Sequence, residues 1–161
     1  MRVLAFDPGY ERLGVAVIEK RQSLPAGRQE VLLHSECVRT KAALSFPERL
    51  ALLGAAAEAL IKEWQPGAMA LEEVFFKENA KTAMKVAEVR GALIYIGVSN
   101  GLVVHQYSPS EVKIAVTGHG AGNKAAIALM VPKLLALPPR KRLDDELDAI
   151  AVGITCLASW R

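Results

Sequence analysis

The stretch Arg2-Val3-Leu4-Ala5-Phe6-Asp7-Pro8-Gly9 decides what fold we expect. Its four consecutive apolar residues are typical of a short strand that is buried on both faces. Pro8 and Gly9 predict a turn that ends this strand. Asp7 therefore stands at the rim of the predicted sheet. An aspartate in a turn often bonds only to its own backbone, so Asp7 alone does not indicate a functional site.

The rest of the chain predicts two more strands, which form an antiparallel meander with the first, and then alternating helices and strands. The predicted strands are residues 2–6, 13–19, 31–38, 68–75 and 102–107, with a hairpin loop over 22–29. The predicted helices lie between Ser45 and Gln65, over 79–99, from Pro109, and over 124–137 and 144–160. Pro132 should kink or split the fourth helix. We expect one α/β domain, residues 1–161, with a mixed five-stranded sheet flanked by helices.

Composition excludes several classes of protein. Of the 161 residues, 52% are apolar and 23% are charged, which is typical of a folded soluble domain. No apolar run is long enough to span a membrane, and the chain enters a strand directly, so we expect a cytoplasmic protein. The net charge of +3 says little about partners. Cys37 and Cys156 lack CxxC spacing and the three histidines are scattered, so we expect buried free thiols and no zinc site.

Glu72 is the second acid of interest, because it lies inside the predicted strand 68–75. Glutamate is a poor strand residue and is rarely buried without a partner. Glu72 and Glu73 point to opposite faces of the sheet, so only one of them can face a given site. The alternative is an edge strand with two solvated acids, although the apolar flanks disfavour it.

Asp145 and Asp148 are spaced i, i+3 on the last predicted helix. This spacing places both carboxylates on one helix face. The alternative is that Asp144 or Asp145 caps the helix and that the other acids favour its dipole. That alternative explains Asp148 less well, because an apolar stretch follows it and no basic residue follows before Arg161.

Together, the four acids predict a metal site. They come from two strands and a helix, and we expect no lysine or arginine to neutralise them. A divalent cation would remove the repulsion between them. Oxygen ligands favour Mg²⁺, or Mn²⁺ as a substitute. Two ions about 4 Å apart can clamp the attacking water and the leaving oxygen of a phosphodiester.

Six strings of the chain, in this order, resemble the RuvC-type Holliday-junction resolvases, which have an RNase H-like fold. They are FDPG (6–9), CVRTK (37–41), LEEVF (71–75), VRGA (89–92), YSPSEVK (107–113) and DELDAIA (145–151), and the match runs from Arg2 to about Leu157. Three features depart from the family: the loop around residues 25–28 looks longer, Pro132 interrupts a helix, and Asp144 competes with Asp145 for the third acid. The i, i+3 spacing to Asp148 favours Asp145.

The resemblance implies an activity and its partners. The catalytic, metal-binding acids would be Asp7, Glu72, Asp145 and Asp148. The protein would be a Mg²⁺-dependent endodeoxyribonuclease, a homodimer that cuts four-way junctions symmetrically during recombination and repair. It would leave 5′-phosphate ends, prefer a short cut sequence, and cooperate with a branch-migration helicase. Two rivals are an RNase H-like nuclease for structured RNA and a non-catalytic junction-binding protein.

The resemblance also indicates residues that contact DNA. Phe75 would stack on unpaired bases near the cut, where stacking is worth about 1–3 kcal/mol per base. Lys113 and Lys124 would lie near the scissile phosphate, and either would stabilise charge in the transition state. Lys77, Lys81 and Lys85 recur every four residues and predict a phosphate-binding stripe. Core packing for Phe75 and solvated surface positions for the lysines are the alternatives.

Overall fold

The computed structural model describes residues 1–21, 30–73, 80–120 and 123–160. The described strands are β1 (Arg2–Asp7), β2 (Arg12–Lys20), β3 (Glu30–Arg39), β4 (Ala68–Glu72) and β5 (Val103–Tyr107). The described helices are α1 (Phe46–Trp64), α2 (Ala80–Ser99), α3 (Pro109–Thr117), α4 (Lys124–Leu134) and α5 (Asp144–Ser159). The predicted hairpin loop over 22–29 and the end of the predicted strand 68–75 lie outside the described residues.

The five strands form one mixed sheet in the order β3-β2-β1-β4-β5. β1 pairs antiparallel with β2, and β2 pairs antiparallel with β3. β4 lies parallel to β1 on its other side, and β5 lies parallel to β4. The predicted meander and the mixed five-stranded sheet are therefore confirmed.

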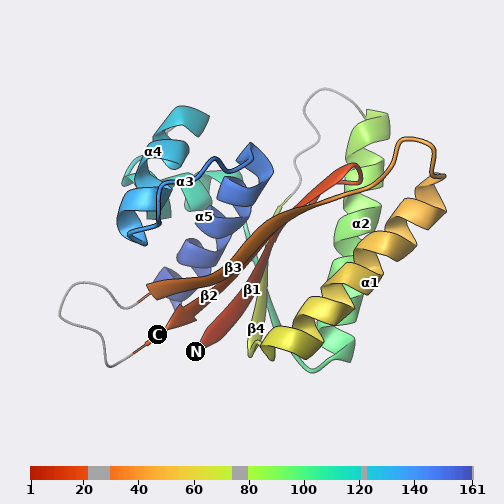
Figure 1. Ribbon diagram of the computed structural model, residues 1–161, viewed down its shortest axis with the longest axis horizontal. Coiled ribbons are helices and arrows are strands. Elements are labelled where there is room, and N and C mark those ends of the chain that lie inside the picture. The colour runs from red at the N-terminus through yellow and green to blue at the C-terminus, as the bar shows by residue number, and fades with distance from the viewer. Residues whose placement is uncertain (22–29, 74–79, 121–122, 161) are drawn as a thin grey trace.

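Helices cover both faces of this sheet (Figure 1). α1 and α2 lie on one side, where they pack over a core that includes Leu4, Phe6 and Leu53. α3, α4 and α5 lie on the other side, over a core that includes Val3, Ala5 and Ile150. β1 is central and contributes buried residues to both cores, because its alternate side chains point to opposite faces. This explains why its apolar run is continuous.

α5 packs very closely against the sheet. A Cβ atom added at Gly153 would lie 2.7 Å from Cδ1 of Ile18 and 3.3 Å from Cβ of Ala5. Only glycine fits this contact without displacing a neighbour, so Gly153 sets the distance between α5 and the centre of the sheet.

The helix boundaries agree with the predicted ones at two places and differ from them at two others. At the start of α3, the Ser108 hydroxyl accepts from the Glu111 amide at 3.2 Å, and the Glu111 carboxylate accepts from the Ser108 amide at 2.7 Å. At the start of α1, the Glu48 carboxylate accepts from the Ser45 amide at 2.8 Å. Pro132 does not split α4, which continues through it and ends at Leu134 instead of residue 137. The cap of α5 is Leu143, so the alternative that Asp144 or Asp145 caps this helix is wrong, although both lie in its first turn.

Candidate active site

Two of the predicted acids lie at the same end of the sheet because their strands are parallel neighbours. Asp7 is the last residue of β1, and Glu72 is the last residue of β4. The register pairs Phe6 with Leu71, one residue before each acid. Both acids are half-buried. The sheet therefore brings together two carboxylates that are 65 positions apart in the sequence.

α5 brings the other two acids to this end of the sheet, and Gly14 of β2 makes its approach possible. Gly14 is paired with Asp7 across the β1–β2 ladder. A Cβ atom at Gly14 would lie 1.9 Å from the carbonyl oxygen of Asp145 and 3.2 Å from Cβ of Asp7. The first turn of α5 thus lies against the strand beside Asp7. A glycine inside an apolar strand signals such a close backbone approach, but the sequence analysis did not use this signal.

The electrostatics show that the acids form one cluster. Burial, followed by the charges of Asp148, Glu72 and Asp145, raises the pKa of Asp7 to about 8, against the opposing charge of Lys124. Burial and the charge of Asp148 likewise raise the pKa of Glu72 to about 6. Burial also raises the pKa of Asp148. Such shifts are typical of functional sites, where like charges are held together at a cost in stability.

The expectation that no lysine or arginine neutralises the acids is wrong. Nε of Arg12 lies 3.4 Å from Oδ2 of Asp145, and Nζ of Lys124 lies 3.4 Å from Oδ2 of Asp148. The carboxylate of Asp148 in turn raises the pKa of Lys124. Both cations come from residues far away in the chain, at the start of β2 and of α4, so a search for neighbours along the sequence could not find them.

The donor chemistry of the cluster suits a hard divalent cation. All four acids offer carboxylate oxygens, and Oδ2 of Asp145 is buried without a hydrogen-bond partner among the described residues. This oxygen forms the ion pair with Arg12 at 3.4 Å but accepts no hydrogen bond, so a metal ion could bind it in place of the arginine. Within the described part of the chain, however, no three acidic, histidine or cysteine side chains are placed so that they could share one ion. The ion pairs with Arg12 and Lys124 draw the oxygens of Asp145 and Asp148 towards those cations.

The other predicted site residues lie at different distances from the acids. The charge of Lys113, which is half-buried on α3, lowers the pKa of Glu72 and so places this lysine near the cluster. Lys81 is exposed. Nζ of Lys85 lies over the ring of Tyr10, 5.0 Å from its centroid. Phe75 and Lys77 lie outside the described residues.

The two cysteines and Glu146 lie outside the acid cluster. Cys37 is half-buried and Cys156 is buried, and both are free thiols, as predicted apart from the exposure of Cys37. Glu146, next to Asp145, is buried and forms an ion pair with Arg140, while Ser35 donates to it at 2.6 Å. Sequence reasoning missed this network, which ties the first turn of α5 to β3.

Within the described residues, no helix is both long and apolar enough to cross a membrane.

The fold and the acid cluster together define an RNase H-like protein with a carboxylate site at the end of its central strand. The comparisons with known proteins then identify the family. The family model of crossover junction endodeoxyribonuclease RuvC matches residues 3–156. This chain belongs to that family.

Relatives and solved structures agree with this assignment. The crossover junction endodeoxyribonuclease RuvC of Syntrophomonas wolfei is 39% identical over 161 residues, covering 100% of this chain and 91% of that protein. The RuvC structure from Thermus thermophilus matches with a TM-score of 0.85 and 34% identity, over 96% of this chain and 92% of that one. The Thermus thermophilus RuvC in complex with a Holliday junction substrate matches over the same shares, with a TM-score of 0.87. The RNase H-like fold predicted from the sequence is confirmed.

Proposed function

We propose that this protein is an endonuclease that resolves four-way DNA junctions during recombination and repair. The observation that carries the proposal is the coupled cluster of Asp7, Glu72, Asp145 and Asp148, at the end of the sheet in a chain of this family. The relatives are named endodeoxyribonucleases, and a solved relative is in complex with a Holliday junction. Both names favour DNA over structured RNA as the substrate.

The four acids are the proposed ligands of Mg²⁺, with Mn²⁺ as a substitute and two ions per site. These ions would supply Lewis-acid activation of water and neutralise charge on the phosphate. Asp7 is the central ligand, because its carboxyl group is electrostatically coupled to those of the other three acids. Glu72 binds on the β4 side, and Asp145 and Asp148 bind on the α5 side.

The residues of the chain itself do three things in this reaction. Asp7, with its pKa raised to about 8, must release a proton before its oxygens can act as ligands at neutral pH, whereas Glu72, with its pKa raised to about 6, has mostly released its proton there. Lys124 balances Asp148 in the resting protein, and Lys113 lies near Glu72. When a phosphodiester enters, these two lysines are placed to stabilise the added negative charge on its oxygens. The proposed product carries a 5′-phosphate.

A symmetric cut requires two active sites, so we propose a homodimer. α2 presents exposed apolar side chains, with Tyr95 exposed to 72% and Val98 to 61%. A groove of about 470 Å³ lies beside them between α1 and α2, lined in part by Leu50, Ala55 and Ile96. Exposed apolar surface of this kind suits a protein contact.

On family grounds we further propose a branch-migration helicase as a partner, a single nuclease domain, and a cytoplasmic setting.

Junction cleavage by Glu72→Gln and Glu73→Gln tests the function and the site together. Both substitutions remove one carboxylate from adjacent positions, but only Glu72 belongs to the cluster that raises the pKa of Asp7. We expect wild-type protein and Glu73→Gln to nick a synthetic mobile junction with Mg²⁺ and not with EDTA. Glu72→Gln should bind the junction without cutting it.

Parallel reactions separate the alternatives. A linear duplex of the same sequence and a structured RNA should remain uncut. Preferential cleavage of the RNA would refute the proposed substrate, and junction binding without any metal-dependent cutting by the wild type would indicate a binding protein. Equal activity of the two glutamate variants would refute the assignment of Glu72.

A further inference from the structure

A second charged pocket lies beside the acid cluster, at the end of the β2–β3 ladder. It has a volume of about 340 Å³ and is lined by Glu11, Arg12, Arg39, Thr40, Ala42 and Arg49. Three arginines face one glutamate there, so the lining is positive. Arg39 and Thr40 belong to the string CVRTK at 37–41, which contributes no residue to the acid cluster.

The register of the sheet places two of these arginines directly opposite each other. Arg12 of β2 pairs with Arg39 of β3 at the end of the ladder. Residues paired across two strands project from the same face, and like charges in that position repel each other. Arg12 is partly balanced by Asp145. No carboxylate in the described part of the chain lies within ion-pair distance of Arg39, which is exposed.

The third arginine is held in place by the backbone around it. Arg49 donates from Nη2 to the carbonyl oxygen of Ala42 at 2.9 Å and from Nε to that of Leu44 at 3.1 Å. Its Nη1 lies 3.7 Å from the Glu11 carboxylate, and its side chain is only 11% exposed. Arg49 is therefore held in place before an anion binds, which lowers the entropic cost of binding, whereas Arg39 and Arg12 are exposed and can turn towards the anion.

The position of the pocket indicates which anion it binds. Arg12 touches both the pocket and Asp145, so the pocket is continuous with the site where the scissile phosphate would lie. Asp7 of β1 pairs with Gly14 of β2, which in turn pairs with Cys37 of β3. The pair of arginines lies two residues further along the β2–β3 ladder, towards its end. Two strand residues span about 7 Å. A DNA strand lying on the acids would thus bring a neighbouring phosphate to the arginines.

We propose that Arg12, Arg39 and Arg49 form a binding site for a backbone phosphate of the junction that flanks the phosphate to be cut. This inference rests on the proposed function. Arginine suits the role because its planar guanidinium donates two hydrogen bonds to a phosphate at once. The bound phosphate also relieves the repulsion between Arg12 and Arg39. The site would fix the position of the strand, and so the place of the cut, without reading the sequence.

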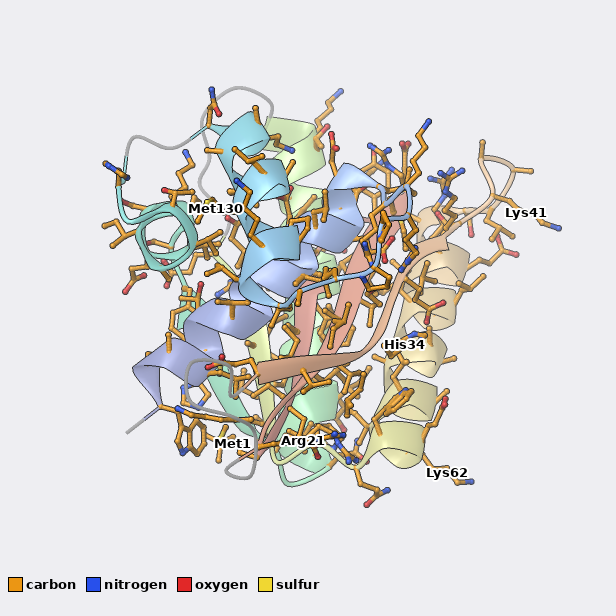
Figure 2. The ribbon with its side chains drawn as sticks, turned by 60° about the vertical axis from the view of Figure 1, so that its left-hand side comes forward. Met1, Arg21, His34, Lys41, Lys62 and Met130 are labelled. Atoms are coloured by element: carbon orange, nitrogen blue, oxygen red, sulfur yellow. The ribbon has the colours of Figure 1, made fainter. Side chains whose placement is uncertain are left out.

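Arg39→Gln is the variant that tests this site, because Arg12 contacts Asp145 and Arg49 holds the 42–44 backbone. Lys62→Gln is the matched control. It removes one exposed positive charge from the C-terminal end of α1. The segment that follows Arg39 leads to the N-terminal end of this helix, and Figure 2 shows Lys41 and Lys62 at its opposite ends. Lys62→Gln should keep the melting temperature of the wild type. Arg39→Gln should keep or exceed it, because the substitution removes the like-charged neighbour of Arg12.

Junctions that carry one neutral methylphosphonate, placed in turn at each phosphate around the cut, identify the contact. We expect Arg39→Gln to bind the unmodified junction about tenfold more weakly. Its slope of log affinity against log salt should be smaller by about one. One methylphosphonate position should weaken the wild type by a similar factor and leave Arg39→Gln unaffected, because the two changes remove the same contact.

Three outcomes would overturn the inference. If Arg39→Gln and Lys62→Gln bind alike while the wild type cuts normally, the pocket does not bind the junction and the proposed function stands. If every methylphosphonate weakens Arg39→Gln as much as the wild type, no phosphate of the junction contacts Arg39, and the assigned contact is refuted. If the wild type neither binds nor cuts junctions, the proposed function fails, and this assignment fails with it.

Discussion

Replacing Asp7 with asparagine should make the metal-free protein more stable and inactive. Asp7 keeps a carboxyl group in a buried place beside three other acids, so its pKa rises from 3.8 to about 8. At neutral pH the folded protein must therefore hold a proton on Asp7 that the unfolded chain has released. Asparagine has nearly the same shape and no charge to bury. The variant should consequently gain stability and lose an essential ligand.

The size of the gain follows from the shift in pKa and depends on pH. Neutral pH lies about three units above the unfolded pKa, and each unit is worth 1.36 kcal/mol, so the penalty of Asp7 is about 4 kcal/mol at pH 7. Because the folded pKa is raised, the folded state binds more protons than the unfolded state. The penalty is therefore absent below about pH 4, grows as the pH rises, and levels off above about pH 8.

Urea unfolding of wild type and Asp7→Asn in EDTA, from pH 4 to pH 8, measures this difference. We expect the two curves to coincide near pH 4 and the variant to be about 2–4 kcal/mol more stable at pH 7, the lower value allowing for imperfect hydrogen bonds of the amide. Added Mg²⁺ should stabilise the wild type and have less effect on the variant. A stability difference that does not change with pH would refute the raised pKa, and junction cleavage by Asp7→Asn would refute its role.

Three other substitutions test the supports of the site. Gly14→Ala places a methyl group where it collides with the Asp145 carbonyl; we expect a loss of about 1–3 kcal/mol in urea unfolding and a roughly 100-fold slower cut in single-turnover assays, whereas wild-type rates would contradict the close approach. Lys124→Gln removes a charge that lowers the pKa of Asp7 and Asp148; the pH of half-maximal cleavage should rise, and an unchanged pH profile would argue against the coupling. Glu146→Gln removes the buried carboxylate of an ion pair whose Arg140 side chain is 46% exposed; urea unfolding should show a loss of about 1–3 kcal/mol, and a neutral effect would mean that the network around it does not hold α5.

Much of the fold could be predicted because the chain is locally consistent. The continuous apolar run of β1 predicted a strand buried on both faces, and its side chains do enter both cores. The predicted start of the third helix at Pro109 is confirmed, because Ser108 and Glu111 cap α3 through local hydrogen bonds. The predicted end of the fourth helix at residue 137 was wrong, because α4 ends at Leu134 and the backbone of Ala136 is left-handed, with a φ of 48°. Local patterns fix where elements lie better than where they end.

The candidate site was only half visible in the sequence. The acids could be chosen because carboxylates at strand ends and at i, i+3 spacing contradict the surrounding apolar pattern. The partners of these acids could not be found in this way, because Arg12 and Lys124 reach them through the tertiary fold. Gly14 and the pocket around Arg39 depend on how α5 and the β3–α1 segment pack, which no local pattern encodes.

Arg12 and Lys124 explain how the fold can hold four acids together before any cation binds. Each occupies an oxygen of one α5 aspartate, at 3.4 Å in both cases. Asp7 has no such partner among the described side chains and is instead kept protonated by its raised pKa. Two cations and a proton thus balance three of the four acids and leave the charge of Glu72, and a bound metal ion would compete with all three for the same oxygens. Arginine and lysine released in this exchange remain next to the site, so the charges that stabilise the resting protein become available to phosphate when DNA arrives. A site of this design should bind metal and DNA with positive coupling, because each removes a cost that the other would otherwise meet.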